Sequence, residues 1–403
     1  PDMADADLDR LLHAPTQPFD YPTGKTITEY LQTQGMGEGI DLMRPVASAN
    51  PHILSARGGR KYELGRVLSS GSMGVVYEAR DLNCRRTVAI KVLPHDVILP
   101  KEEQLRFVEE AQITSQLEHP NIVPIHELGL DAEGRIYYAM KYVQGRTLTD
   151  ILIALRKHDP DTVRDFPLSR LLNIFQKTCD AVAFAHSHGV VHRDLKPDNI
   201  MIGEFGEVVV MDWGLATVAG DDATATRSEP PPRVISTDAM DLKKATAAVP
   251  GATIEVMRTE TAVGDTSRRV LGTPGFMAPE HLVPETPVHT RSDIYSLGAT
   301  LYSILCLRAP LGGKDVKEVL RKILEGEIAP PTVFNASPKE AGQPSLPHCP
   351  DGLVPAVLSD IAMRALATHA ADRYATVLDM QAEVQAYQDG LVWHVVVDQD
   401  FTD

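Results

Sequence analysis

The stretch "HRDLKPDNIMIGEFGEVVVMDWG" (residues 192–214) decides how the rest of the chain is interpreted. Two acids and an amide, Asp194, Asn199 and Asp212, flank a segment whose pattern predicts a short β-hairpin. The apolar run before Asp212 predicts a buried strand, and the rigid end of a strand aims that carboxylate in a fixed direction. Gly214 then allows the chain to turn away.

Further motifs lie on both sides of this stretch in a fixed order. Gly71 and Gly74, in "LSSGSMGVVYEA" (68–79), mark a turn between two predicted strands, which alone is weak evidence. Lys91 follows at the end of the strand "VAIK", and Glu110 lies on the apolar stripe of a predicted helix at 101–118. The segment "GTPGFMAPE" (272–280) comes after residues 192–214.

With these five motifs in this order, the chain resembles a eukaryotic-type serine/threonine protein kinase of the bacterial Hanks-type group. The resemblance covers residues 61–390. It implies an α+β, bilobal protein kinase fold, with a small β-rich N-lobe at 61–143 and a larger helical C-lobe at 144–390. Residues 1–60 are then an N-terminal extension, either a linker or a regulatory arm, and residues 391–403 are a C-terminal tail.

The order of predicted elements agrees with two segregated lobes. Strand-like runs at 62–69, 74–80, 87–93 and 135–143 precede helical patterns at 170–189, 292–307, 314–326, 356–367 and 376–390. Residues from about 220 to 269 have no periodicity and are predicted to form a long activation-loop insert. A short helix is also expected at 26–35.

Composition excludes several classes of protein. The net charge of −16 argues against a nucleic-acid binder, which would present a basic face. Four scattered cysteines without short spacings favour free thiols in a reducing compartment, so a cytoplasmic location is expected. No apolar run reaches the length of about 18 residues needed to span a bilayer, so no membrane segment is expected.

Two other motifs are rejected. "YPTGKT" ends like a phosphate-binding P-loop, but Phe19 stands where that pattern requires glycine. His186, His188 and His192 have the look of metal ligands, yet no further cluster completes a tetrahedral set. We interpret these histidines as structural or surface residues.

The resemblance assigns the catalytic roles. Asp194 is the base that accepts the proton of the substrate hydroxyl, and Lys196 steadies the transferred phosphoryl group. Lys91 binds the α- and β-phosphates of ATP and is oriented by an ion pair with Glu110. The predicted Mg²⁺ ligands are Asn199 and Asp212, whose oxygens are the hard ligands that this ion prefers.

The nucleotide site is likewise implied by the resemblance. Its members are Leu68, Ser69, Gly71, Gly74, Val76, Ala89, Lys91, Met140, Lys141, Val143 and Met201. Backbone groups of Lys141 and Val143 are expected to hydrogen-bond the adenine. Ser69 replaces the first glycine of the family pattern, so somewhat weaker nucleotide binding is expected.

Trp213 is a second departure, because the family usually has phenylalanine there. Either the indole fills the same apolar slot, or its size hinders an inward-to-outward flip and favours a preassembled site.

Three other residues are expected to stabilise the lower lobe. Asp293 braces the catalytic loop, while Glu280 and Arg373 pair to tie down the activation segment.

Regulation and partners follow from the same resemblance. Arg193 is the residue that pairs with a phosphorylated loop in regulated kinases, and Thr266 and Ser267 are the preferred autophosphorylation sites. The alternative is a solvated spacer whose hydroxyls do nothing. Expected partners are proteins that bear Ser or Thr, and a second copy of this chain for autophosphorylation. A pseudokinase scaffold or nucleotide-sensing domain is the alternative function.

Overall fold

The computed structural model describes residues 18–19, 61–71, 74–93, 101–131, 135–214, 216–218, 274–283, 289–313, 315–335 and 346–391. The helix expected at 26–35 and the insert at about 220–269 lie outside these residues. So do nearly all of the N-terminal extension and of the C-terminal tail.

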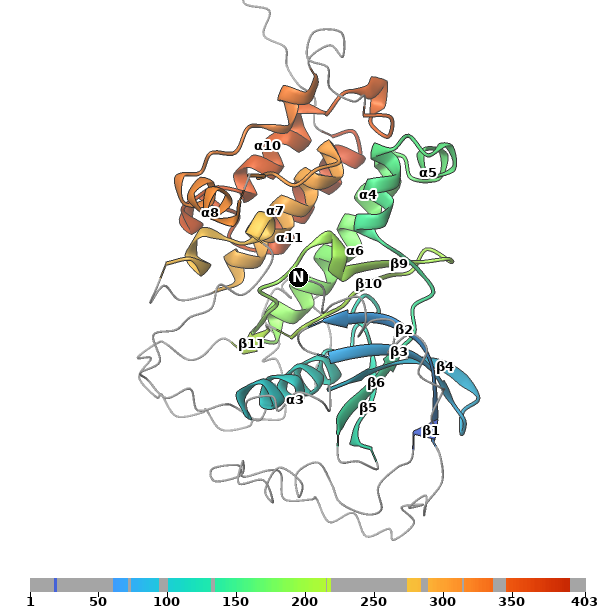
Figure 1. Ribbon diagram of the computed structural model, residues 1–403. Coiled ribbons are helices and arrows are strands. Elements are labelled where there is room, and N and C mark those ends of the chain that lie inside the picture. Colours follow the sequence, from blue (N-terminus) through green and yellow to red (C-terminus); the bar gives the residue numbers. More distant parts are fainter. Residues whose placement is uncertain are drawn as a thin grey trace, which may run out of the picture.

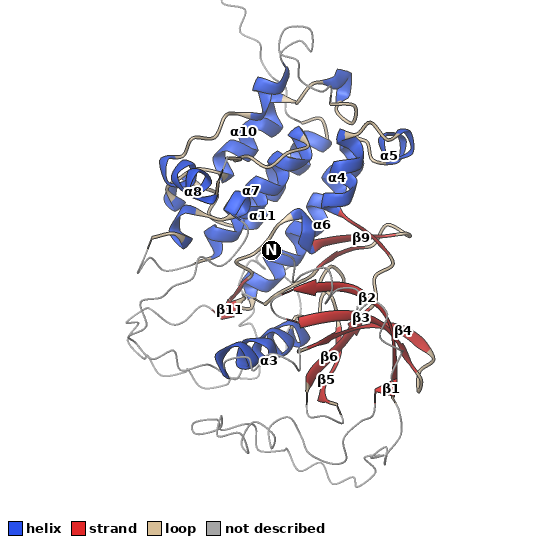
Figure 2. Cartoon of the chain, in the orientation of Figure 1, coloured by secondary structure: helices blue, strands red, loops and turns tan. Residues whose placement is uncertain are grey.

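The N-lobe is built on one antiparallel sheet with the strand order β1-β2-β3-β4-β6-β5 (Figures 1 and 2). Its strands are β1 (Pro18–Phe19), β2 (Tyr62–Gly71), β3 (Gly74–Asp81), β4 (Arg86–Val92), β5 (Ile125–Leu130) and β6 (Ile136–Lys141). Strand β1 comes from the N-terminal extension and pairs with β2, Phe19 opposite Tyr62. The extension therefore contributes an edge strand to the sheet.

Helix α3 (Lys101–Gln116) lies beside one face of this sheet (Figure 1). That face carries Lys91 and its ladder partner Tyr138, because successive side chains of a strand point to opposite faces. Tyr138 packs there against Phe107 and other buried residues of α3. The opposite face has its own apolar cluster, which includes Ile90 and Tyr137. Register thus fixes which residues face α3.

The C-lobe is mainly helical and is held together by one large apolar cluster. Its helices are α4 (Leu148–Arg156), α5 (Pro160–Asp165), α6 (Leu168–Ser187), α7 (Thr290–Cys306), α8 (Val316–Glu325), α10 (Ala356–Ala365) and α11 (Val377–Gln388). Helix α7 is buried from Ser292 to Cys306 and is therefore the central helix of this lobe. The hydroxyls of Thr300 and Ser303 donate to backbone carbonyls one turn earlier in the same helix.

Short strands of the C-lobe frame the stretch at 192–214. Strand β8 (Val190–Val191) precedes it, and η1 (Pro197–Asn199), β9 (Ile200–Gly203) and β10 (Val208–Val210) lie within it. Strands β10, β9 and β7 (Gly145–Thr147) form a three-stranded sheet, while β8 pairs with β11 (Thr217–Val218). The predicted hairpin before Asp212 is therefore confirmed.

The bilobal α+β fold and the principal strands and helices expected from the sequence are confirmed. The structure adds elements that the pattern did not predict, namely β5, β7, α4 and α5. Strand β5 reads "IHELGL", which is too polar for a clear strand pattern, and it is stabilised by pairing with β6. Helix α4 is short and depends on a capping box between Thr147 and Asp150.

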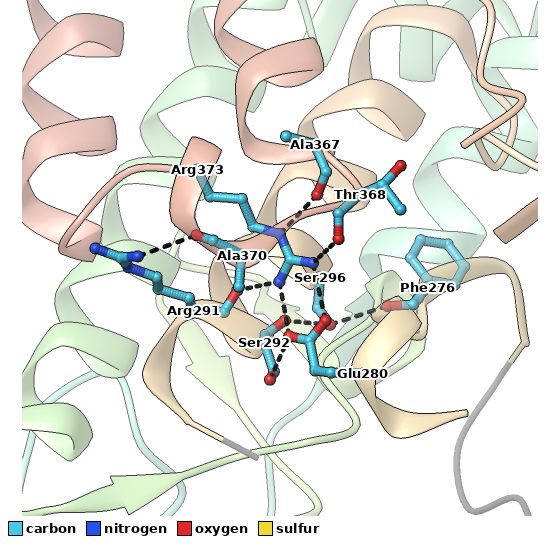
Figure 3. A network of polar contacts seen from close by, with 9 residues as sticks. All are labelled: Phe276, Glu280, Arg291, Ser292, Ser296, Ala367, Thr368, Ala370 and Arg373. Atoms are coloured by element: carbon cyan, nitrogen blue, oxygen red, sulfur yellow. Dashed lines mark hydrogen bonds and ion pairs between the residues drawn. The ribbon is translucent and has the colours of Figure 1, made fainter. Parts of the chain in front are cut away.

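A buried ion pair ties the 3₁₀ turn η3 (Pro279–His281) to the helical lobe (Figure 3). The guanidinium of Arg373 donates to both Glu280 oxygens, at 2.7 and 2.8 Å. Its remaining three N–H groups donate to the backbone carbonyls of Ala367 at 2.8 Å, Arg291 at 2.9 Å and Thr368 at 3.1 Å. All five donors are thus satisfied, and Ser292 Oγ donates to Glu280 as well. The expected pairing of these residues is confirmed.

The Glu280→Gln substitution is expected to lower the free energy of unfolding by about 3–5 kcal/mol, because it leaves the Arg373 charge buried without its counter-ion. Burial alone raises the pKa of Glu280, but Arg373 and Ser292 outweigh it and lower the pKa to about 2. This carboxylate therefore contributes stability above its ordinary value of 4.5, and the contribution is lost as the pH falls towards 2. Denaturant titrations between pH 7 and pH 3 measure both effects.

Glu327→Gln is the matched control, because Glu327 pairs with Arg321 while both side chains are 48% exposed. An exposed pair contributes about 1 kcal/mol or less. If the two variants lose equal stability, the role assigned to the Glu280–Arg373 pair is wrong.

Candidate functional site

Lys91 and Glu110 form a buried ion pair where strand β4 faces helix α3. Lys91 Nζ lies 2.9 and 2.8 Å from the two oxygens of Glu110. The side chains are 11% and 3% exposed. Glu110 lies on the buried side of α3, as the helical spacing predicted. The residues that sequence analysis paired are therefore in contact.

Asp212 lies close to this pair, although it comes from the other lobe. A Cβ atom at Gly214 would sit 3.0 Å from Glu110 Oε2 and 3.3 Å from Asp212 Oδ1, so both carboxylates border the same glycine. Burial lowers the pKa of Lys91, but Glu110 and Asp212 outweigh it and the pKa is raised. The ammonium group therefore keeps its charge at neutral pH.

The catalytic loop, residues 192–199, is held in place by Asp293 of helix α7. Its fully buried carboxylate accepts the backbone N–H groups of His192 at 2.8 Å and of Arg193 at 2.9 Å. His186 Nε2 lies 2.8 Å from the same carboxylate. Burial raises the pKa of Asp293, but these hydrogen bonds and the nearby histidines lower it overall. The expected brace is confirmed, and His186 is a member that sequence analysis did not assign to it.

Two residues of this region adopt left-handed backbone conformations. Arg193 has φ of 70° and Asp212 has φ of 59°, and neither is glycine. Such conformations cost on the order of 1–3 kcal/mol each and collect at functional sites, where surrounding contacts hold them. The Asp293 hydrogen bond to Arg193 is one such contact.

Asp194, Lys196 and Asn199 are joined by hydrogen bonds. Lys196 Nζ lies 2.7 Å from Asp194 Oδ2. The amide nitrogen of Asn199 donates to the Asp194 carbonyl at 2.8 Å and lies 3.5 Å from Oδ2. Since its nitrogen is the donor, the Asn199 side chain presents its oxygen as the remaining acceptor. The structure thus brings the predicted base, its lysine and one predicted metal ligand together.

His192 links this loop to the segment that carries Asp212. Its Nδ1 accepts the backbone N–H of Asp194 at 3.3 Å, so the proton lies on Nε2, which faces the Met211 carbonyl at 3.2 Å. The imidazole also lies 4.5 Å from the Trp213 ring, measured between centroids. This histidine therefore has a structural role, as expected from the sequence.

The predicted adenine-site residues lie on the α3 face of the N-lobe sheet and at the adjoining edge of the C-lobe. Ala89 is opposite Met140 in the β4–β6 ladder, and Val76 is opposite Lys91 in the β3–β4 ladder. Val143, Met140 and Met201 belong to one small apolar cluster. The Lys141 N–H already donates to the Pro124 carbonyl at 3.0 Å, so this N–H is not available to a ligand. Leu68 is 36% exposed on β2, where Ser69 pairs with Val76.

The glycine-containing turn is described on both of its sides, at Gly71 and Gly74, which pair with each other. Gly74 has φ of 135°, and a Cβ atom there would lie 2.7 Å from the Val92 carbonyl oxygen. This glycine is therefore required by the close approach of strands β3 and β4. The turn residues 72–73 lie outside the described residues.

The three histidines of the rejected metal motif all contact other groups of the protein. His188 Nδ1 faces the Phe184 carbonyl at 2.9 Å, and the other two histidines are engaged as described above. Across the described ranges, no group of three or more His, Cys, Asp or Glu residues is suited to hold a metal ion.

Within the same ranges, no helix has the length and apolar character needed to cross a membrane. All four cysteines are free thiols, and only Cys84 is exposed.

Tyr138 was not among the site residues predicted from the sequence, yet its hydroxyl donates to Glu110 Oε1 at 2.7 Å. The only signal in the sequence is its place two residues before Met140, which puts both side chains on the same face of a strand. Nothing in that pattern indicates a hydrogen bond to helix α3.

Trp213 is 1% exposed and belongs to the C-lobe core, and its buried indole nitrogen has no hydrogen-bond partner. The slot-filling interpretation predicts that Trp213→Phe changes the free energy of unfolding by about 1 kcal/mol or less. The smaller ring loses packing contacts, but the substitution also removes a buried donor without a partner. Such a donor destabilises the folded state by about 1–3 kcal/mol, so the two effects oppose each other. Urea unfolding measures this. A variant with altered activity and inhibitor preference would instead support the restrained flip.

Comparisons with known proteins agree with this geometry. Residues 62–242 match the family described as protein kinase domain. "Serine/threonine-protein kinase PknD" of Chlamydia pneumoniae is 31% identical over 333 residues, which are 82% of this chain and 31% of that protein. The PknD proteins of Chlamydia trachomatis serovar L2b and Chlamydia felis are 32% and 33% identical over 334 residues, again 82% of this chain, and 32% and 31% of those proteins.

The chain thus spans about a third of the length of the curated relatives it matches. The matched region includes the ion pair of Lys91 and Glu110, the catalytic loop and Asp212. The bilobal fold, the arrangement of these groups and the matches point the same way. Residues 62–242 of this chain form a protein kinase domain, and 82% of the chain is similar to bacterial serine/threonine protein kinases.

Proposed function

We propose that this chain is an active serine/threonine protein kinase that transfers the γ-phosphoryl group of ATP to Ser and Thr hydroxyls of proteins. The observation that carries the proposal is the assembly of charged groups from both lobes. Lys91 is already paired with Glu110, and Glu110 borders Gly214, which Asp212 also borders. The printed names of the Chlamydia relatives support the same activity.

The residues present fit a nucleotide and a magnesium ion. Lys91 supplies a fixed positive charge for phosphate oxygens, and burial strengthens that interaction because the local dielectric is low. Asn199 and Asp212 offer the oxygen ligands that Mg²⁺ prefers. When bound, the ion would neutralise negative charge that develops on the phosphates.

In the proposed reaction, the hydroxyl oxygen of the substrate attacks the γ-phosphorus, and the bond to the β-phosphate oxygen breaks to release ADP. Asp194 accepts the hydroxyl proton, so its carboxylate must be held in one orientation. Lys196 Nζ at 2.7 Å and the Asn199 amide nitrogen at 3.5 Å contact Asp194 Oδ2 and restrict that orientation. Lys196 also supplies positive charge beside the transferred group. The backbone of this loop is fixed by Asp293.

A pseudokinase scaffold remains the second candidate function. Ser69 and Trp213 are the departures that favour it. The contacts within the described site support the active kinase instead. Lys91 pairs with Glu110, Asn199 donates to Asp194, and Glu110 and Asp212 border the same glycine.

The Asp194→Asn substitution tests the proposal. We expect phosphate transfer to a generic Ser/Thr substrate to fall by about 10²- to 10⁴-fold, because the amide cannot accept the hydroxyl proton. Radiolabelled ATP with Mg²⁺ gives the rate, and thermal unfolding should be nearly unchanged.

Asp198→Asn is the matched control, since Asp198 is an exposed carboxylate in the same loop. It should keep nearly full activity. A wild-type protein that binds nucleotide but transfers no phosphate would support the pseudokinase alternative.

We further propose that autophosphorylation of the insert at about 220–269 raises activity, with Thr266 and Ser267 as preferred sites. A phosphate adds a charge of about −1.5 to −2, which Arg193 of the catalytic loop is suited to pair with. After incubation with ATP and Mg²⁺, mass spectrometry should detect phosphate in residues 220–270 of the wild type and not of Asp194→Asn. No phosphate in that region, from an active wild type, would exclude this regulation.

A further inference from the structure

Tyr138 completes a cluster with the ion pair of Lys91 and Glu110. Its hydroxyl donates to Glu110 Oε1 at 2.7 Å, and the same oxygen accepts from Lys91 Nζ at 2.9 Å. Lys91 Nζ also lies 5.7 Å from the centroid of the Tyr138 ring. Both tyrosine and glutamate are buried, so these contacts act in a low-dielectric environment.

Tyr138 and Lys91 hold Glu110 from two different strands. Lys91 lies on β4, and Tyr138 is its direct partner in the ladder on β6. A tyrosine has few rotatable bonds, and this one packs against Phe107 of α3 with ring centroids 5.0 Å apart. Strand β6 therefore fixes both the helix and the carboxylate that the helix carries.

The hydroxyl also affects the charge of Glu110. Burial raises the pKa of this carboxyl above its ordinary value, and Lys91 and Tyr138 limit that rise. Burial and the nearby Glu110 raise the pKa of Tyr138 well above its ordinary value, so the phenol remains a proton donor. A neutral donor stabilises the carboxylate without competing with Lys91 for charge.

We propose that Tyr138 is a positioning residue, which holds the Glu110 carboxylate inward so that Lys91 is presented to the phosphates of the nucleotide. The inference rests on the proposed kinase activity but concerns a residue outside the set that sequence analysis assigned. Tyr138 acts through Glu110 and has no assigned contact with the nucleotide.

The chain offers a matched control in the adjacent residue. Tyr137 lies on the same strand but on the opposite face, where its hydroxyl donates to Glu127 at 3.3 Å. It is also fully buried. Removal of either hydroxyl makes the same chemical change in the same strand. Only the change at Tyr138 removes a hydrogen bond to Glu110.

The experiment compares Tyr138→Phe with Tyr137→Phe in steady-state kinetics and in titration with a fluorescent ATP analogue. For Tyr138→Phe we expect kcat/KM for ATP to fall about tenfold, as for the loss of a hydrogen bond to a charged group. Affinity for the analogue should fall as well. KM for the protein substrate should stay within about twofold, and Tyr137→Phe should resemble the wild type.

A double-mutant cycle separates positioning from general packing. In a Glu110→Gln background, Tyr138→Phe should have little further effect on kcat/KM, because the carboxylate that it positions is already absent. Equal losses in both backgrounds, or identical behaviour of the two tyrosine variants, would overturn the inference. If the wild type transfers no phosphate, the proposed function fails, and the analogue titration alone still decides whether Tyr138 supports nucleotide binding.

Discussion

The buried contact between Lys91 and Glu110 is the interaction on which the candidate site depends. Removing two opposite charges from water is costly, and the cost is repaid only when geometry is good and the remaining lone pairs are satisfied. Here the ammonium contacts both carboxylate oxygens, and a phenol occupies a further acceptor position. The pair therefore exists only while helix α3 is docked on the sheet, which makes the site and the fold of the N-lobe inseparable.

The C-lobe holds its part of the site in place by a different kind of contact. Its catalytic loop is fixed through backbone N–H groups, which are bound by the buried carboxylate of Asp293. Backbone hydrogen bonds do not depend on which side chains the loop carries. The loop can therefore hold Arg193 in an unfavourable conformation and still present Asp194 and Asn199 in a defined arrangement.

The sequence predicted the parts of the molecule that local pattern governs. Helical spacing located α3, and placed Glu110 on its buried side. The family motifs identified Asp194 and Asp212. What escaped prediction depends on contacts between distant segments. Strand β5 has a polar sequence and forms because β6 lies beside it, and the role of Tyr138 arises only after α3 packs on the sheet. A pattern of alternating residues contains no information about either partner.

The two halves of the site therefore differ in how readily they can be disturbed. Displacing the catalytic loop means breaking backbone bonds to a carboxylate that lies at the centre of the molecule, on a helix buried on every side. Displacing the N-lobe half of the site means tilting helix α3 away from the N-lobe sheet. Movement of α3 would break the contacts of Glu110 with Lys91 and Tyr138, while the hydrogen bonds of Asp293 to the catalytic loop would stay in place.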